Sequence, residues 1–143
     1  MITTCRWMLV FGLGLAGAAQ AADGRAAADA ARFAGTYQGQ LQSDGAPAPA
    51  ETILEAGADG ALHGRNSFLD NGADMPGTLS QCSVTALDVR CRWQDRYGEG
   101  SLTMHFDAAA CGFRGEWTAA GRTGPRMFWN GNRHCERPGK PTT

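Results

Sequence analysis

The segment Cys111–Cys135 is symmetric in residue type about a turn at Gly121-Arg122-Thr123, and this symmetry limits how the chain can fold. Folded there as a hairpin, the segment forms four pairs in one register: Cys111 with Cys135, Phe113 with Arg133, Gly115 with Gly131, and Trp117 with Trp129. Side chains alternate along a strand with period two, so all four pairs share one face. A cysteine pair, a glycine pair and a tryptophan pair therefore predict one antiparallel β-hairpin.

The alternation continues upstream through three more short turns, at Ala109-Ala110, Arg96-Tyr97 and Ala86-Leu87. The register then places Phe106 opposite Phe113, Trp93 opposite Gly100, Val84 opposite Val89, and Cys82 opposite Cys91. One face of this five-strand meander collects Cys82, Val84, Val89, Cys91, Trp93, Leu102, Met104, Phe106, Phe113, Trp117, Met127, Trp129 and Arg133. The other face is polar except at Phe128, as in an antiparallel sheet with one solvated side.

Turn signals divide residues 33–135 into eight candidate strands. They are Phe33–Gln42, Glu51–Ala56, Gly60–Leu69, Gly77–Thr85, Leu87–Asp95, Gly98–Asp107, Gly112–Ala119 and Arg126–His134. We expect long loops at Ser43–Ala50 and Leu69–Pro76, which are rich in Pro, Gly, Asp and Asn. Two registers fit Glu51–Ala56, because Ile53 and Leu54 are both apolar.

Glycines alternate with inward aromatic residues in several of these strands, a pattern suited to strongly curved sheets. Closure of such a sheet removes its exposed edges. We therefore predict an all-β fold, an antiparallel up-and-down meander of about eight strands that closes into a small barrel. A β-sandwich is the alternative.

The N-terminus predicts export. Arg6 precedes the apolar run Trp7–Ala18, and Ala19-Gln20-Ala21 is a small-x-small cleavage site, so Met1–Ala21 has the pattern of a secretory signal peptide. We expect cleavage after Ala21, which leaves a periplasmic or secreted protein of 122 residues, with cleavage after Ala22 as the alternative. The remaining divisions are an Ala-rich helical leader at 22–32, a single β-domain at 33–135, and a disordered tail at 136–143.

The mature chain keeps four cysteines: Cys82, Cys91, Cys111 and Cys135. An even count in an exported protein predicts two disulfides, and the registers above favour Cys82–Cys91 and Cys111–Cys135. A zinc site is the competing interpretation, but the chain has no Cys-x-x-Cys pair.

Charge and motifs exclude several classes of function. With Arg6 removed from the 13 basic residues, 12 remain against 14 acidic ones, which favours neither nucleic acid nor an anionic membrane surface. His63, His105 and His134 are dispersed, so we expect neither a metal site nor a cofactor. No serine lies in a Gly-x-Ser-x-Gly elbow, and the cysteines are assigned to disulfides. We expect no enzymatic activity and no stable membrane anchor after signal cleavage.

Three features resemble the calycin superfamily of lipocalins and avidins: Gly35-x-Tyr37 after a short helical leader, an up-and-down meander, and Arg133 on the last strand. The family has Gly-x-Trp in its first strand and an Arg near the end of the chain that packs over it, so Tyr37 stands where Trp is usual. The resemblance implies a barrel whose interior binds a small ligand.

The candidate ligand-binding residues are those predicted to face inward: Tyr37, Trp93, Met104, Trp117, Trp129 and Arg133. The tryptophans also suit a filled core. Arg133 has two interpretations, as a cap on the barrel end that stacks on Tyr37 or Phe113 and bonds to carbonyls, or as an anchor for a ligand carboxylate.

Two functions follow. The first is a carrier or sequestering protein for a small apolar or amphipathic ligand. The second is a periplasmic protein-interaction module, of inhibitor or immunity type, acting through the loops Ser43–Ala50 and Leu69–Pro76.

Overall fold

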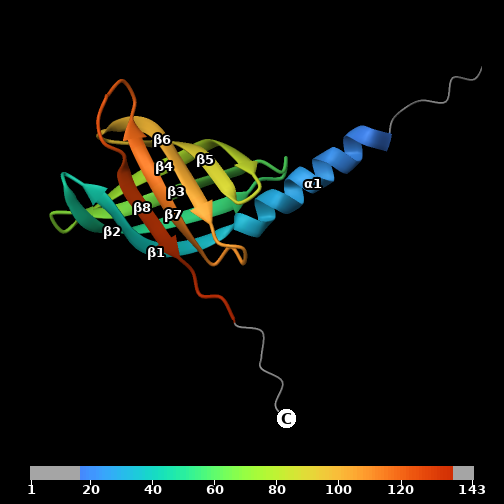
Figure 1. The fold of residues 1–143 in the computed structure, drawn as a ribbon, viewed down its shortest axis with the longest axis horizontal. Helices are drawn as coiled ribbons and strands as arrows, with labels where there is room; N and C mark the ends of the chain where they lie inside the picture. The colour runs from blue at the N-terminus through green and yellow to red at the C-terminus, as the bar shows by residue number, and fades with distance from the viewer. Residues whose placement is uncertain (1–16, 137–143) are drawn as a thin grey trace, which may run out of the picture.

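The computed structural model describes residues 17–136, in which one helix precedes eight antiparallel strands that close into a barrel (Figure 1). The elements are α1 (Gly17–Phe33), β1 (Gly35–Ser43), β2 (Ala46–Ala56), β3 (Leu62–Asp70), β4 (Ala73–Thr85), β5 (Asp88–Asp95), β6 (Gly98–Phe106), β7 (Gly112–Ala119) and β8 (Met127–Asn132). Each strand pairs with its neighbours in sequence, and β8 pairs with β1. The predicted all-β up-and-down barrel is therefore confirmed, and the β-sandwich alternative is wrong.

The N-terminal predictions reach only partly into this range. Residues 1–16 of the predicted signal peptide and residues 137–143 of the predicted tail lie outside the described residues. The Ala-rich leader is helical, as predicted, and forms the second part of α1. No helix within residues 17–136 is long and apolar enough to span a membrane.

The registers of the central meander agree with the prediction at three hairpins. Phe106 pairs with Phe113, Trp93 with Gly100, and Val84 with Val89. The alternation of burial follows, since Val89, Cys91 and Trp93 are buried and the residues between them are exposed.

The last hairpin departs from the prediction. Gly115 pairs with Trp129 and Trp117 with Met127, so the predicted register between these strands is wrong by two residues. The symmetric turn does not form, because residues 120–126 make a longer connection between β7 and β8. A shift of two residues keeps every side chain on its predicted face, and Trp129 is still buried.

Both predicted disulfides are present. Cys111 and Cys135 lie just outside the paired part of β7 and β8, with their Cα atoms 5.8 Å apart. Cys82 and Cys91 link β4 to β5 at a bulge, where Gln81 and Cys82 together oppose Cys91. Two disulfides indicate an oxidising, extracellular type of environment.

The two predicted loops are strands. Ser43–Ala50 and Leu69–Pro76 each contain only a two-residue turn, Asp44-Gly45 and Asn71-Gly72. All four turn residues have positive φ, between 48° and 81°, as in the type I′ turns that suit twisted hairpins. The prediction followed the prolines and overlooked the Asp-Gly and Asn-Gly pairs, which are strong hairpin signals.

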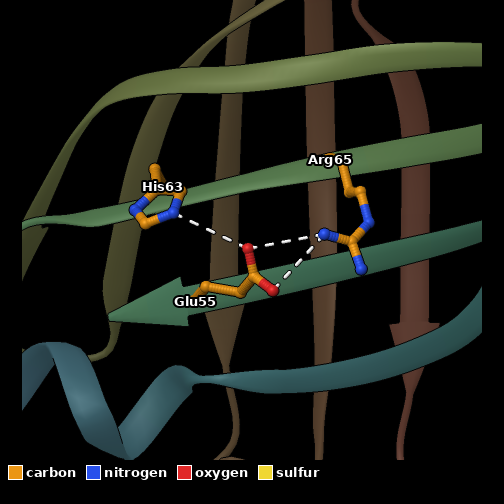
Figure 2. A network of polar contacts seen from close by, with 3 residues as sticks. All are labelled: Glu55, His63 and Arg65. Atoms are coloured by element: carbon orange, nitrogen blue, oxygen red, sulfur yellow. Dashed lines mark hydrogen bonds and ion pairs between the residues drawn. The ribbon is translucent and has the colours of Figure 1, made fainter. Parts of the chain in front are cut away.

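The outer wall of the barrel is polar. Figure 2 shows Glu55 of β2 between His63 and Arg65 of β3, with Oε2 3.6 Å from His63 Nε2 and Oε1 3.4 Å from Arg65 Nη1. All three side chains are about half exposed, so these ion pairs add little to stability. They mark the solvated face of the sheet.

The barrel end next to α1 is closed by aromatic side chains. Phe33, the last residue of α1, is fully buried, and its ring centroid lies 4.7 Å from that of Phe106. Tyr37 and Phe113 pack edge to face at 5.5 Å in the same cluster. The helix itself extends away from this end of the barrel (Figure 1).

Gly131 of β8 makes room for this cluster. A Cβ at that position would lie 2.7 Å from Cε1 of Phe113 and 2.9 Å from Cβ of Tyr37. We therefore expect Gly131→Ala to lower the free energy of unfolding by about 1–3 kcal/mol through overpacking, measured by urea denaturation. Gly124→Ala is the matched control, because nothing lies within 4 Å of its added Cβ. Equal stability of the two variants would contradict this account of the core.

Candidate ligand-binding site

A cavity of about 770 Å³ opens at the barrel end opposite α1. β1 runs from the helix to Ser43, so the turns at Asp44-Gly45 and Arg96-Tyr97 and the connection 120–126 surround its mouth. The volume is within the range of about 300–1,000 Å³ that is typical of small-ligand sites. No segment of the described chain closes this end as Phe33 closes the other.

Large apolar side chains make up most of the floor and walls of the cavity. Six large side chains from five strands line it: Leu41, Phe68, Trp93, Trp117, Met127 and Trp129. Burial of a ligand's apolar surface against them is favourable by roughly 25 cal/mol per Å². The cavity is therefore suited to a molecule with a substantial hydrocarbon or aromatic part.

Hydrogen bonds hold two of the indoles in place. Trp129 Nε1 donates to Thr52 Oγ1 at 2.9 Å, and Trp93 Nε1 donates to the Thr118 carbonyl at 3.1 Å. The rings of Trp93 and Trp117 are nearly perpendicular, with centroids 5.2 Å apart. Gly100 allows this arrangement, since a Cβ there would lie 2.8 Å from Trp93 Nε1. The aromatic wall is thus preformed.

Asn66 of β3 is a polar group deep in the same cavity. It is only 6% exposed, and its carboxamide has no hydrogen-bond partner among the side chains and backbone of residues 24–136. The buried side-chain atoms without a partner in the described chain are Trp117 Nε1 and Arg133 Nε, so the Asn66 amide is open to the cavity, and a ligand that displaces solvent from it must replace the lost hydrogen bonds. Asn66 therefore provides a hydrogen-bonding group for a ligand in an otherwise mainly apolar cavity.

The mouth is polar and mainly acidic. Asp44, Asp70, Asp95 and Glu99 line it together with one basic residue, Arg122. The Tyr97 hydroxyl donates to Asp70 Oδ2 at 2.5 Å, and this hydrogen bond raises the pKa of the phenol. Tyr97 thereby links the β5–β6 turn to the end of β3.

Of the six residues predicted to bind a ligand, the structure brings three together at the cavity: Trp93, Trp117 and Trp129. Met104 is fully buried in the core, on the strand between β5 and β7. Tyr37 and Arg133 lie at the closed end. These last three residues do not line the cavity.

Arg133 matches the first of its two interpretations. Its Nη1 donates to the Ala34 carbonyl at 2.6 Å and its Nη2 to the Arg32 carbonyl at 3.2 Å, while Cζ lies 5.3 Å from the centroid of the Tyr37 ring. A Cβ on Gly35 would lie 2.7 Å from Nη1, so the glycine of Gly-x-Tyr accommodates the guanidinium. The arginine ties β8 to the end of α1, far from the mouth.

The structure adds residues that the sequence did not single out. Leu41, Asn66 and Phe68 line the cavity from β1 and β3, and Tyr97 and Asp70 from its mouth. The inward positions of β3, Leu62, Asn66 and Phe68, could have been found from the alternation once the Asn71-Gly72 turn was fixed. Within the described residues, no three His, Cys, Asp or Glu side chains are grouped so as to hold a metal ion.

Comparison with models of known protein families finds no match for this chain. A search of curated proteins likewise finds no relative. The functional argument therefore depends on the geometry of the barrel and its cavity.

Tyr37 generates a prediction about alkaline pH. Its buried hydroxyl donates to the Phe33 carbonyl at 2.9 Å. Burial raises the pKa of this phenol above the ordinary value of about 10, Arg133 lowers it in part, and Asp107 raises it further. A folded-state pKa above the unfolded value gives stability that is complete below about pH 10 and is lost as the pH rises through the folded-state pKa.

We expect Tyr37→Phe to cost about 1–2 kcal/mol at neutral pH, because the Phe33 carbonyl loses its donor. Above about pH 10, the stability of the wild type should fall more steeply than that of the variant. Urea denaturation followed by tryptophan fluorescence at several pH values measures both effects. Parallel pH profiles of the two proteins would show that Tyr37 ionisation is not linked to unfolding.

Proposed function

We propose that this protein is an exported, calycin-like carrier or sequestering protein that binds a small apolar or amphipathic ligand in the cavity at its open end. The observation that carries the proposal is the 770 Å³ chamber walled by Trp93, Trp117 and Trp129. A barrel that served only as a scaffold would gain stability by filling this volume with side chains. The protein acts by binding and does not transform its ligand.

The contrast between the two ends of the barrel supports this proposal. The end beside α1 is filled by a packed cluster of Phe33, Tyr37, Phe106 and Phe113. The opposite end has aromatic side chains of similar size, but they line a cavity. One end therefore specifies the fold, and the other is available for a ligand.

The calycin assignment is supported by the closed end. Arg133 of the C-terminal segment lies over Tyr37 of the first strand, the arrangement that the resemblance implies. Export is supported by the signal-peptide pattern and the two disulfides. The protein then meets its ligand in the periplasm or the medium.

The structure gives less support to a protein-interaction module. Ser43–Ala50 and Leu69–Pro76, the loops assigned to that role, are paired strands with two-residue turns. They offer little irregular surface for recognition, so we favour the carrier. Binding of a partner protein without any small ligand remains a distinct outcome of the experiment below.

The test is titration of the purified protein with N-phenyl-1-naphthylamine, a neutral apolar fluorophore. We expect saturable fluorescence enhancement with one probe per protein and quenching of tryptophan emission, because the probe would lie against the three indoles. Ala119→Phe should weaken binding at least about tenfold, since Ala119 lines the cavity and a phenyl ring there would occupy it.

Ala58→Phe is the matched control for this titration. Ala58 is exposed in the β2–β3 turn, near the closed end, so the same substitution there should leave probe binding unchanged. Absence of saturable binding, or equal binding by the two variants, would contradict the proposed cavity function. Native mass spectrometry of the protein from its own host would then show whether a protein partner accompanies it.

A further inference from the structure

We propose that the natural ligand is a cationic amphiphile, with an amine or quaternary ammonium group at the acidic mouth and an apolar body against the tryptophan wall. This inference rests on the proposed carrier function and names the chemical class of its ligand. Three observations carry it: the charge of the mouth, the aromatic faces beside it, and the unpartnered Asn66.

The mouth has an excess of negative charge. Four carboxylates line the cavity, from Asp44, Asp70, Asp95 and Glu99, against the single guanidinium of Arg122. Charges around an opening with low-dielectric walls produce a focused potential, which attracts ions of opposite charge. The mouth therefore favours a cation over an anion, although the whole chain is nearly neutral, with a net charge of −1.

Three of these carboxylates are not neutralised by the protein. Glu99 forms an ion pair with Arg92, but within the described chain no basic side chain lies within 4.0 Å of the carboxylates of Asp44, Asp70 or Asp95. On the outer wall, by contrast, Glu55, Asp88 and Glu116 each have a basic partner at that distance. The mouth retains unpaired negative charge where a ligand would pass.

Asp70 and Asp95 are also held in position. Asp70 accepts the hydrogen bond from the Tyr97 hydroxyl, and Asp95 Oδ1 accepts one from the Tyr97 backbone N–H at 2.7 Å. One residue of the β5–β6 turn thus orients two carboxylates at the edge of the cavity. Asp70 Oδ1 accepts a further hydrogen bond from Asn71 Nδ2 at 3.2 Å, but neither Tyr97 nor Asn71 brings a positive charge to these carboxylates.

The aromatic rings next to these carboxylates suit the same charge. Tyr97 and Phe68 have centroids 6.5 Å apart and both line the cavity, and the Arg96 guanidinium already lies over the Tyr97 ring, with Cζ 5.5 Å from its centroid. The electron-rich faces of aromatic rings attract ammonium groups, most strongly where water is partly excluded. Carboxylates and aromatic faces together recognise a substituted amine, whose alkyl groups contact the rings while its charge faces the aspartates.

Asn66 shows that the cavity is built for more than a hydrocarbon. Its carboxamide makes no hydrogen bond within the described residues, is open to the cavity, and lies on the wall below the mouth, on the same strand as Asp70. An amide that offers one acceptor and two donors can bind a hydroxyl, carbonyl or amine in the body of the ligand. A purely apolar ligand would leave it unsatisfied.

The inference is tested by displacement of N-phenyl-1-naphthylamine with three ligands that share a ten-carbon chain: decyltrimethylammonium, 1-decanol and decanoate, each below its aggregation limit. We expect the cation to bind at least about tenfold more tightly than the alcohol, and decanoate to bind more weakly than the alcohol. A higher NaCl concentration should reduce the difference, because it screens the exposed aspartates.

The double variant Asp70→Asn and Asp95→Asn should lose most of the preference for decyltrimethylammonium and keep its affinity for decanol and the fluorophore. Glu55→Gln is the control, since it removes one negative charge from the outer wall and should leave all affinities unchanged. Glu55→Gln removes one charge and the double variant removes two, so the single variant Asp70→Asn is also measured and compared directly with Glu55→Gln.

The outcomes separate the two proposals. If the fluorophore does not bind, the carrier function fails. If the fluorophore binds and the three ligands displace it equally, or decanoate displaces it best, the carrier function stands and the cationic ligand is overturned. A cation preference that survives the double variant would also overturn the role assigned to these aspartates.

Discussion

The barrel closes where β1 meets β8, over only four residue pairs, one of which joins Gly39 to Gly131. A Cβ on Gly39 would lie 2.0 Å from the Asn130 carbonyl oxygen, so the two backbones approach to a distance that no larger residue permits. This contact turns an open meander into a barrel without edges. It also leaves space on the inner side, which the rings of Tyr37 and Phe113 fill. The glycines that let β1 and β8 pair also leave the room that the aromatic cluster fills, so barrel closure and core packing at the α1 end depend on the same residues.

Most polar groups around this closure are hydrogen-bonded within the chain, and the buried Nε of Arg133 is the exception that the described residues show. The guanidinium of Arg133 bonds to the carbonyls that follow α1, and the phenol of Tyr37 bonds to Phe33. At the other end of the barrel, the carboxamide of Asn66 makes no hydrogen bond within the described residues, and three cavity aspartates have no basic side chain within 4.0 Å there. Buried or converging polar groups that a protein leaves unpaired are expected at binding sites. The same barrel thus separates groups used for folding from groups available for recognition.

Period-two alternation was enough to predict the class of fold, three hairpin registers and both disulfides, because a one-residue error would have turned each buried face outward. It could not fix the register of the last hairpin. The connection 120–126 is too long to form a defined turn, and a register shift of two residues leaves every side chain on the same face of the sheet. The cavity was harder to predict. Trp93, Trp117 and Trp129 were expected inside, but whether inward tryptophans fill a core or line a chamber depends on how many side chains share the space. Arg133 and Met104 face inward as well, yet they belong to the packed part of the barrel. No local sequence pattern distinguishes inward residues of the packed part from those that line the cavity.

Neither disulfide involves a residue that lines the cavity. Cys111–Cys135 secures the C-terminal segment beside α1, and Cys82–Cys91 joins two strands within the wall. The covalent cross-links therefore stabilise the scaffold without restraining the turns that carry Asp44, Tyr97 and Arg122. Those turns can change in length and composition while the cross-linked frame stays intact. A family of such barrels could diversify its ligands by exchanging mouth segments alone, and the same division makes this chain a natural framework on which to graft new binding specificities.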